Sequence, residues 1–95
     1  MRETALIVGG CGAFGTVFAA HLASAGYEVV TVDKGPEADV RCDVQADPDA
    51  LRAHVPNAGV VLLCVPEGAI VSALEAMDGV ASSGVLIVDI CSVKA

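Results

Sequence analysis

A cluster of glycines near the amino terminus constrains the fold of this chain more than any other feature. The stretch GGCGAFG spans residues 9–15 and contains four glycines. It follows the apolar run TALIV and precedes a helical pattern that begins near Ala13. Because glycine weakens any regular element that it interrupts, the cluster predicts a tight turn between a strand and a helix.

Strand and helix patterns alternate along the rest of the chain. Strands are predicted at 4–9, 28–33, 39–43, 59–64 and 84–90, and helices at 13–25, from about 47 to His54, and at 67–77. Gly26 is expected to end the first helix, Pro56-Asn57 the second, and Pro66 the fourth strand. The alternation predicts an α/β fold with a doubly wound parallel sheet of about 4–5 strands, covered by helices on both faces. Residues 1–95 are expected to form one domain.

Composition and charge exclude several classes of protein. Hydrophobic residues make up 55% of the chain and Trp is absent, so the core is expected to be aliphatic. With 12 acidic and 5 basic residues, a net charge of −7 argues against nucleic-acid binding. No apolar run is long enough to span a membrane, which predicts a cytoplasmic protein. The four cysteines show no C-x-x-C spacing, which indicates reduced thiols and no metal site.

The glycine cluster contains the pattern G-x-G-x-x-G at Gly10, Gly12 and Gly15. The pattern follows a strand, opens a helix, and is answered by Asp33 at the end of the next strand, about 20 residues further on. This is the dinucleotide fingerprint of Rossmann-like folds, in which the helix N-terminus faces the pyrophosphate. The intervening residues Cys11, Ala13 and Phe14 are therefore also expected to contact the cofactor.

The carboxylate of Asp33 predicts NAD as the cofactor. It would accept hydrogen bonds from the adenosine ribose hydroxyls and repel a 2′-phosphate, while the neighbouring Lys34 would soften the preference over NADP. Two alternatives remain open at this point. The loop could hold a flavin, or the glycines could shape a turn that binds nothing.

Two further strand ends are expected to complete the site, because ligands of open α/β sheets bind beyond the carboxyl ends of the strands. At the first, Val65 and Pro66 could line the cofactor through their backbone. At the second, Ser92 and Lys94 would face the place where substrate meets nicotinamide. Each also has a plainer interpretation. The first segment could simply end its strand, and the second could be a solvated chain end. The two histidines, His21 and His54, are expected on the surface, so the sequence offers no general base.

Three segments together resemble the N-terminal part of the prephenate and arogenate dehydrogenase family. They are IVGGCGAFGTVFAAHLASAGYEVVTVD, LLCVPEGAI and VDICSVKA, and they cover nearly all of the chain except residues 34–58. The resemblance implies oxidative decarboxylation of prephenate or arogenate with NAD(P), in the biosynthesis of tyrosine or related aromatic amino acids. It also implies that Ser92 lies near the substrate hydroxyl and helps to orient a catalytic histidine, with Lys94 as a second candidate.

The chain departs from that family because it ends at Ala95, before the position of the family's catalytic histidine. The resemblance therefore implies a cofactor-binding part that is inactive alone, within a full-length protein that forms homodimers. An amino-substituted prephenate remains an alternative substrate. Two other interpretations remain. One is a reductase of another substrate class, acting on a hydroxyacid or an imine, and the other is a non-catalytic module that senses NAD.

Overall fold

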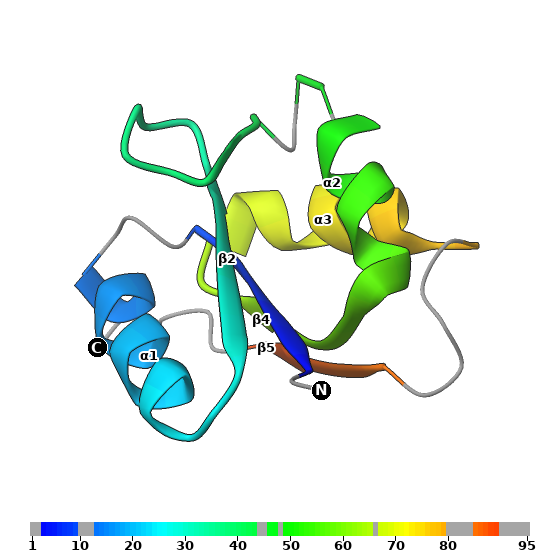
Figure 1. The fold of residues 1–95 in the computed structure, drawn as a ribbon. Helices are drawn as coiled ribbons and strands as arrows, with labels where there is room; N and C mark the ends of the chain where they lie inside the picture. The colour runs from blue at the N-terminus through cyan, green and yellow to red at the C-terminus, as the bar shows by residue number, and fades with distance from the viewer. Residues whose placement is uncertain are drawn as a thin grey trace.

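The computed structural model describes residues 3–9, 13–43, 46–47, 49–65, 67–79 and 85–89. Figure 1 shows how its helices and strands are arranged. In chain order they are β1 (Thr4–Val8), α1 (Ala13–Ser24), β2 (Glu28–Asp33), β3 (Val40–Arg41), α2 (Asp49–His54), a 3₁₀ turn η1 (Val55–Asn57), β4 (Ala58–Leu63), α3 (Glu67–Met77) and β5 (Leu86–Asp89).

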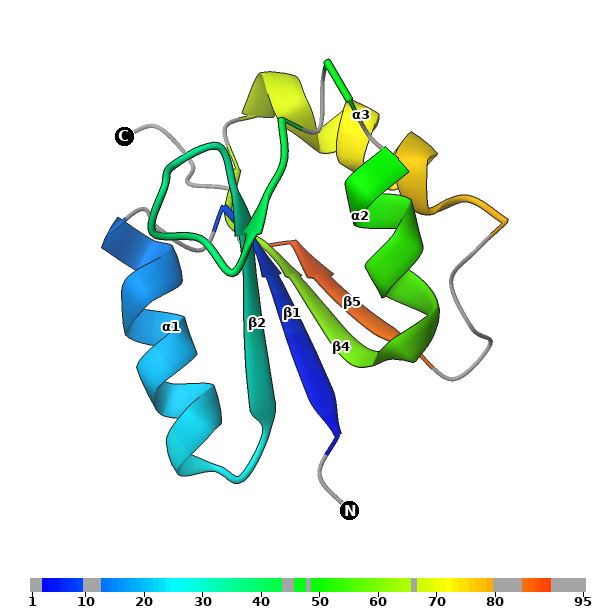
Figure 2. The same cartoon turned by 45° about the horizontal axis from the view of Figure 1, so that its top comes forward.

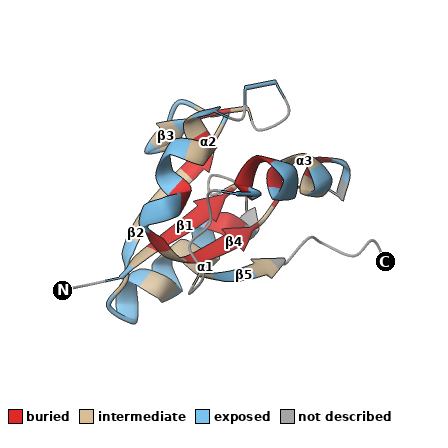
Figure 3. Ribbon diagram, turned by 90° about the vertical axis from the view of Figure 1, so that its right-hand side faces the viewer, coloured by how far each residue is buried: buried red, intermediate tan, exposed pale blue. Residues whose placement is uncertain are grey.

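The strands form one parallel sheet in the order β3-β2-β1-β4-β5. The chain moves outward from β1 to β3, crosses back, and continues outward from β4 to β5. Helix α1 lies on one side of the sheet and α2 and α3 on the other (Figures 2 and 3). This is the doubly wound, Rossmann-like arrangement predicted from the alternation of strands and helices, and its order reverses between β1 and β4.

The core is aliphatic, as the composition predicts. On the side of α2 and α3, alternate strand residues such as Leu6, Val8 and Leu63 form a cluster with Leu51 of α2 and Met77 of α3. The intervening residues of β1 are equally buried. Burial on both faces explains why β1 and β4 are continuous apolar runs without alternating polar positions.

The ends of the helices follow from specific residues. Gly26, at φ +101°, ends α1 as predicted. The Gly26 N–H donates to the carbonyl of Ala23 and the Tyr27 N–H to that of Leu22, both at 3.1 Å, which is the pairing of a Schellman motif. At the start of α2, Oδ1 of Asp47 accepts a hydrogen bond from the N–H of Asp49 at 3.4 Å, as a capping side chain does.

Several element boundaries differ from the predictions by one residue: β1 ends at Val8, α1 ends at Ser24, and β4 spans Ala58–Leu63. The helix α2 ends at His54 as predicted, but the chain continues into the 3₁₀ turn η1, which was not predicted. The strand β3 has two residues instead of five, since Asp39 bonds to Thr31 through its side chain and its N–H rather than through a strand ladder. The last strand begins at Leu86, with Val85 outside it, and the predicted ends Gly84 and Ile90 lie outside the described residues.

Candidate nucleotide-binding site

The turn after β1 begins with Gly9, which the sequence predicts both as the end of a strand and as the first residue of the glycine cluster. Its φ is +83°, and its N–H donates to the carbonyl of Val32 at 2.6 Å. A Cβ at this position would lie 2.7 Å from the carbonyl oxygen of Cys64. Glycine is therefore required here both by the backbone conformation and by the close approach of β4. The doubled glycine at the end of an apolar run was the sequence signal for it.

The rest of the fingerprint is described in part. Gly15 is buried in the first turn of α1. Gly10, Cys11 and Gly12 lie outside the described residues. So do the side chains of Ala13 and Phe14, whose backbone begins α1.

Asp33 is the last residue of β2, at the carboxyl edge of the sheet. Its Oδ1 accepts a hydrogen bond from the N–H of Lys34 at 2.7 Å, and its carbonyl accepts one from the N–H of Cys42 at 2.8 Å. The side chain is half-buried. Asp33 directly follows Val32, which accepts the hydrogen bond from Gly9. The backbone of Asp33 is therefore adjacent to the residue that contacts the start of the glycine turn.

An open hollow of about 480 Å³ lies beside Asp33, at the edge formed by β2 and β3. It is lined by Lys34, Arg41, Cys42, Asp43 and Asp47. The two cationic side chains are exposed, whereas Cys42 is buried and its Sγ donates to the carbonyl of Asp47 at 3.2 Å. Burial raises the pKa of the Cys42 thiol, so this group is neutral and contributes no charge to the hollow.

The segment after β4 packs directly against the glycine turn. The Cys64 N–H donates to the carbonyl of Val8 at 2.8 Å. Val65 is 9% exposed and belongs to the core, so its side chain does not line an open site and only its backbone is available to a ligand there. Pro66 lies outside the described residues.

The substrate side of the predicted site falls outside the described residues. The backbone of Asp89 ends β5 at the same edge as Asp33, but Ser92 and Lys94 follow it and are not described. Both histidines are exposed, as expected. His21 lies near the end of α1, and His54 ends α2 with Nδ1 2.9 Å from the carbonyl oxygen of Ala50. Both positions are at the amino edge of the sheet, remote from Asp33.

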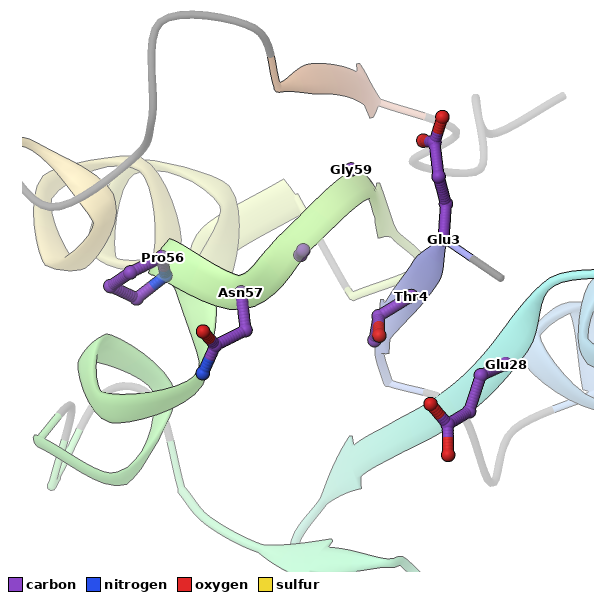
Figure 4. A pocket seen from close by; sticks show the side chains of 7 residues that line it. Glu3, Thr4, Glu28, Pro56, Asn57 and Gly59 are labelled. Atoms are coloured by element: carbon purple, nitrogen blue, oxygen red, sulfur yellow. The ribbon is translucent and has the colours of Figure 1, made fainter. Parts of the chain in front are cut away.

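A second hollow, of about 470 Å³, lies at that amino edge (Figure 4). It is lined by Glu3, Thr4, Glu28, Pro56, Asn57, Ala58 and Gly59. It faces away from the glycine turn and carries two carboxylates and no cation, so it does not suit a phosphate. Within the described ranges, no group of His, Cys, Asp or Glu side chains is arranged to hold a metal ion.

Comparison with known proteins identifies the class of this chain. Residues 4–92 match the family described as NADP oxidoreductase, coenzyme F420-dependent, and the chain belongs to that family. The match covers all five strands and three helices. It defines an NAD(P)-binding oxidoreductase-type domain, without assigning it to prephenate dehydrogenases in particular.

Two solved structures share the fold. The 3-alpha-hydroxysteroid dehydrogenase from Pseudomonas sp. B-0831, complexed with NADH, is 18% identical with a TM-score of 0.66, over 79% of this chain and 40% of that one. RSP, a Rex-family repressor, is 17% identical with a TM-score of 0.54, over 94% of this chain and 53% of that one. The present chain thus spans about half or less of either protein. No curated protein matches it. In the part of the chain that is described, no helix has the length and apolar character needed to cross a membrane.

Proposed function

We propose that this chain is the nucleotide-binding part of a dehydrogenase that prefers NAD. The observation that carries the proposal is the hydrogen bond from the N–H of Gly9 to the carbonyl of Val32, which joins Gly9 to the peptide unit that carries Asp33. A turn with small residues suits a pyrophosphate, and a carboxylate at the end of β2 suits the ribose hydroxyls. When bound, the nicotinamide supplies the hydride acceptor, while these residues bind and orient it.

The preference for NAD rests on the charge of Asp33. The name of the family gives NADP as its coenzyme, and Lys34 and Arg41 beside the hollow would favour a 2′-phosphate. However, Asp33 is the group at the end of β2 itself, where the ribose hydroxyls are expected. Its carboxylate would repel a 2′-phosphate at short range, whereas the two cations are exposed and more strongly screened by solvent.

The substrate that we propose is a prephenate-like acid, oxidised with loss of carbon dioxide. Its support is the resemblance of the three quoted segments, above all the S-V-K sequence at residues 92–94. In this proposal Ser92 contacts the substrate hydroxyl, and full-length protein forms a homodimer in the cytoplasm. Assays of the full-length gene product with prephenate, arogenate, an amino-substituted prephenate and a hydroxyacid would distinguish the substrate classes.

Calorimetric titration with NAD and NADP tests the nucleotide proposal. We expect the wild-type chain to bind NAD more tightly than NADP. In Asp33→Asn we expect NAD binding to weaken by roughly tenfold, which corresponds to the loss of about 1.4 kcal/mol from charge-assisted hydrogen bonds. The difference between the affinities for NAD and NADP should also become smaller in Asp33→Asn. Asp78→Asn, an exposed carboxylate at the end of α3, is the matched control and should bind like wild type.

Failure of the folded wild-type chain to bind either nucleotide would contradict the proposal. NAD binding without turnover by the full-length protein would instead favour a non-catalytic, NAD-sensing module. That second function has a specific motive, because the same fold occurs in a protein named as a repressor.

A further inference from the structure

Gly9 contacts three separate segments of the candidate site. It belongs to the turn that leads into the G-x-G-x-x-G sequence. Its N–H donates to the carbonyl of Val32, which is part of the peptide unit that carries Asp33. The space that a Cβ on Gly9 would need is taken by the carbonyl of Cys64, which is part of the peptide unit that carries Val65.

The contact between Gly9 and Cys64 leaves no room for a side chain. A Cβ on Gly9 would lie 2.7 Å from the carbonyl oxygen of Cys64, 2.9 Å from its carbonyl carbon and 3.2 Å from Cγ1 of Val65. The two nearest atoms are backbone, so the obstruction cannot be relieved by rotating a side chain. One strand end would have to move relative to the other.

The surroundings of these strand ends make such a movement costly. Val8, Val32 and Val65 all belong to the same buried core, with exposed fractions of 1%, 0% and 9%. Densely packed interiors transmit a displacement instead of absorbing it. A shift at Gly9 is therefore expected to change the distance between the glycine turn and Asp33.

We propose that Gly9 is a positioning residue for the dinucleotide, which it serves by holding the ends of β1, β2 and β4 at the spacing that binding requires. Gly9 acts through Asp33 and through the glycine sequence that follows Gly9. It does not need to contact the ligand itself. This inference rests on the proposed function. It adds Gly9 to the residues on which binding of the dinucleotide depends.

The chain contains a well-matched control for this role. Gly79 follows α3 with φ +82°, almost the same as the +83° of Gly9, but a Cβ there would meet nothing within 4 Å. Gly79→Ala therefore introduces the backbone strain of a positive φ without the collision. Gly9→Ala introduces both, so comparing the two variants isolates the effect of the collision between strand ends.

The experiment measures NAD and NADP affinity for wild type, Gly9→Ala and Gly79→Ala, at a temperature where circular dichroism shows each to be folded. We expect both variants to melt earlier than wild type. Only Gly9→Ala should bind NAD more weakly, by about tenfold or more, because displacements near 1 Å at a binding site can cost that much. It should also discriminate less between NAD and NADP, which loss of stability alone would not produce.

A folded Gly9→Ala that binds like Gly79→Ala would overturn this inference and leave the proposed function intact. If wild type itself binds neither nucleotide, the proposed function fails and the inference falls with it, so the two failures are distinguishable. If Gly9→Ala does not fold, Val65→Ala replaces it, because it removes Cγ1 and Cγ2 of Val65, and Cγ1 is the nearest side-chain atom to the Cβ position of Gly9. Its control is Val61→Ala, a buried valine within β4. Weaker NAD binding in Val65→Ala alone supports the inference, and equal binding in the two overturns it.

Discussion

At the scale of single residues, the thiol of Cys64 shows how position changes chemistry. It lies at the carboxyl end of β4 beside the glycine turn, and burial raises its pKa from 9.0 to about 11. The cause is desolvation, which penalises the charged thiolate. At neutral pH the thiol is therefore protonated and a poor nucleophile, even though it borders the candidate site.

This pKa predicts two measurable effects. Alkylation of Cys64 by iodoacetamide, followed by peptide mass spectrometry, should stay slow through pH 9 and accelerate toward pH 11. Because the folded state holds its proton above the pH at which the unfolded state releases it, the free energy of unfolding should fall between pH 9 and 11. In Cys64→Ser that fall should be smaller. Rapid alkylation of Cys64 at pH 8 in the folded chain would contradict the expectation.

Sequence reasoning found the residues whose chemistry is local. Asp33 was predicted at the end of a strand because its carboxylate interrupts an apolar pattern, and the structure has it there. The glycine cluster marked Gly9 as part of a turn, but the close approach of Gly9 to Cys64, which is 55 positions further along the chain, was not predicted. A contact between two strand ends leaves no trace in the spacing of residues. The hydrogen bonds of the Asp39 side chain to Thr31, which shorten β3, were not predicted either, because they too join residues that are apart in the sequence.

At the scale of elements, Arg52 links the two helices on one side of the sheet. It lies on α2, and its Nη1 donates to the carbonyl of Ala76 at 2.8 Å and to that of Asp78 at 3.4 Å. The carbonyl of Ala76 is among the last four of α3, which have no partners within the helix, and Asp78 directly follows the helix. The guanidinium also places a positive charge at the negative end of the helix dipole.

Arg52→Met should therefore destabilise the chain, while it keeps most of the apolar part of the side chain. We expect a loss of about 1 kcal/mol in the free energy of unfolding, since the bonds are charge-assisted but partly exposed. Urea denaturation followed by circular dichroism measures it. Arg41→Met, on the exposed edge strand β3, is the control and should lower the free energy of unfolding by less. Equal losses in the two variants would show that the link between α2 and α3 contributes nothing measurable.

Elements were predictable where the pattern was long and its ends were marked. The bounds of α3 were predicted as they are found, and β2 likewise, because strong breakers flank both. The 3₁₀ turn η1 was not predicted. Pro56 stands at one of the first positions of this turn, where a backbone N–H would have no partner within the turn. The missing N–H of proline therefore costs nothing there. A proline after a helix pattern thus does not decide whether the chain breaks or continues into a 3₁₀ turn.

At the scale of the whole molecule, the sheet is unevenly covered. Among the described strands β5 lies at one end of the sheet order. Its adjacent residues Leu86 and Ile87 are 59% and 37% exposed. Neighbouring residues of a strand point to opposite faces, so apolar surface is exposed on both faces of β5. Such a strand is a site for association with another chain.

We expect the isolated 95-residue chain to self-associate as its concentration rises, and Leu86→Thr to reduce this. Because Leu86 is mostly exposed, the melting temperature should change little. Sedimentation velocity over a range of concentrations measures the association. Val17→Thr, which alters an equally exposed apolar residue on α1, is the control. A wild-type chain that stays monomeric at high concentration, or a Leu86→Thr variant that associates like wild type, would contradict the prediction.

The hollow beside Asp33 has a consequence for how this protein could change over evolutionary time. Of the residues that line it, Lys34, Arg41 and Asp47 are exposed and lie outside the aliphatic core. Substitutions at exposed positions usually alter folding stability by less than about 0.5 kcal/mol. Mutation can therefore exchange the charges of this surface one at a time while the sheet beneath stays the same. In our proposal these charges adjoin the adenosine ribose, so a lineage could change its preferred coenzyme without first acquiring a more stable fold.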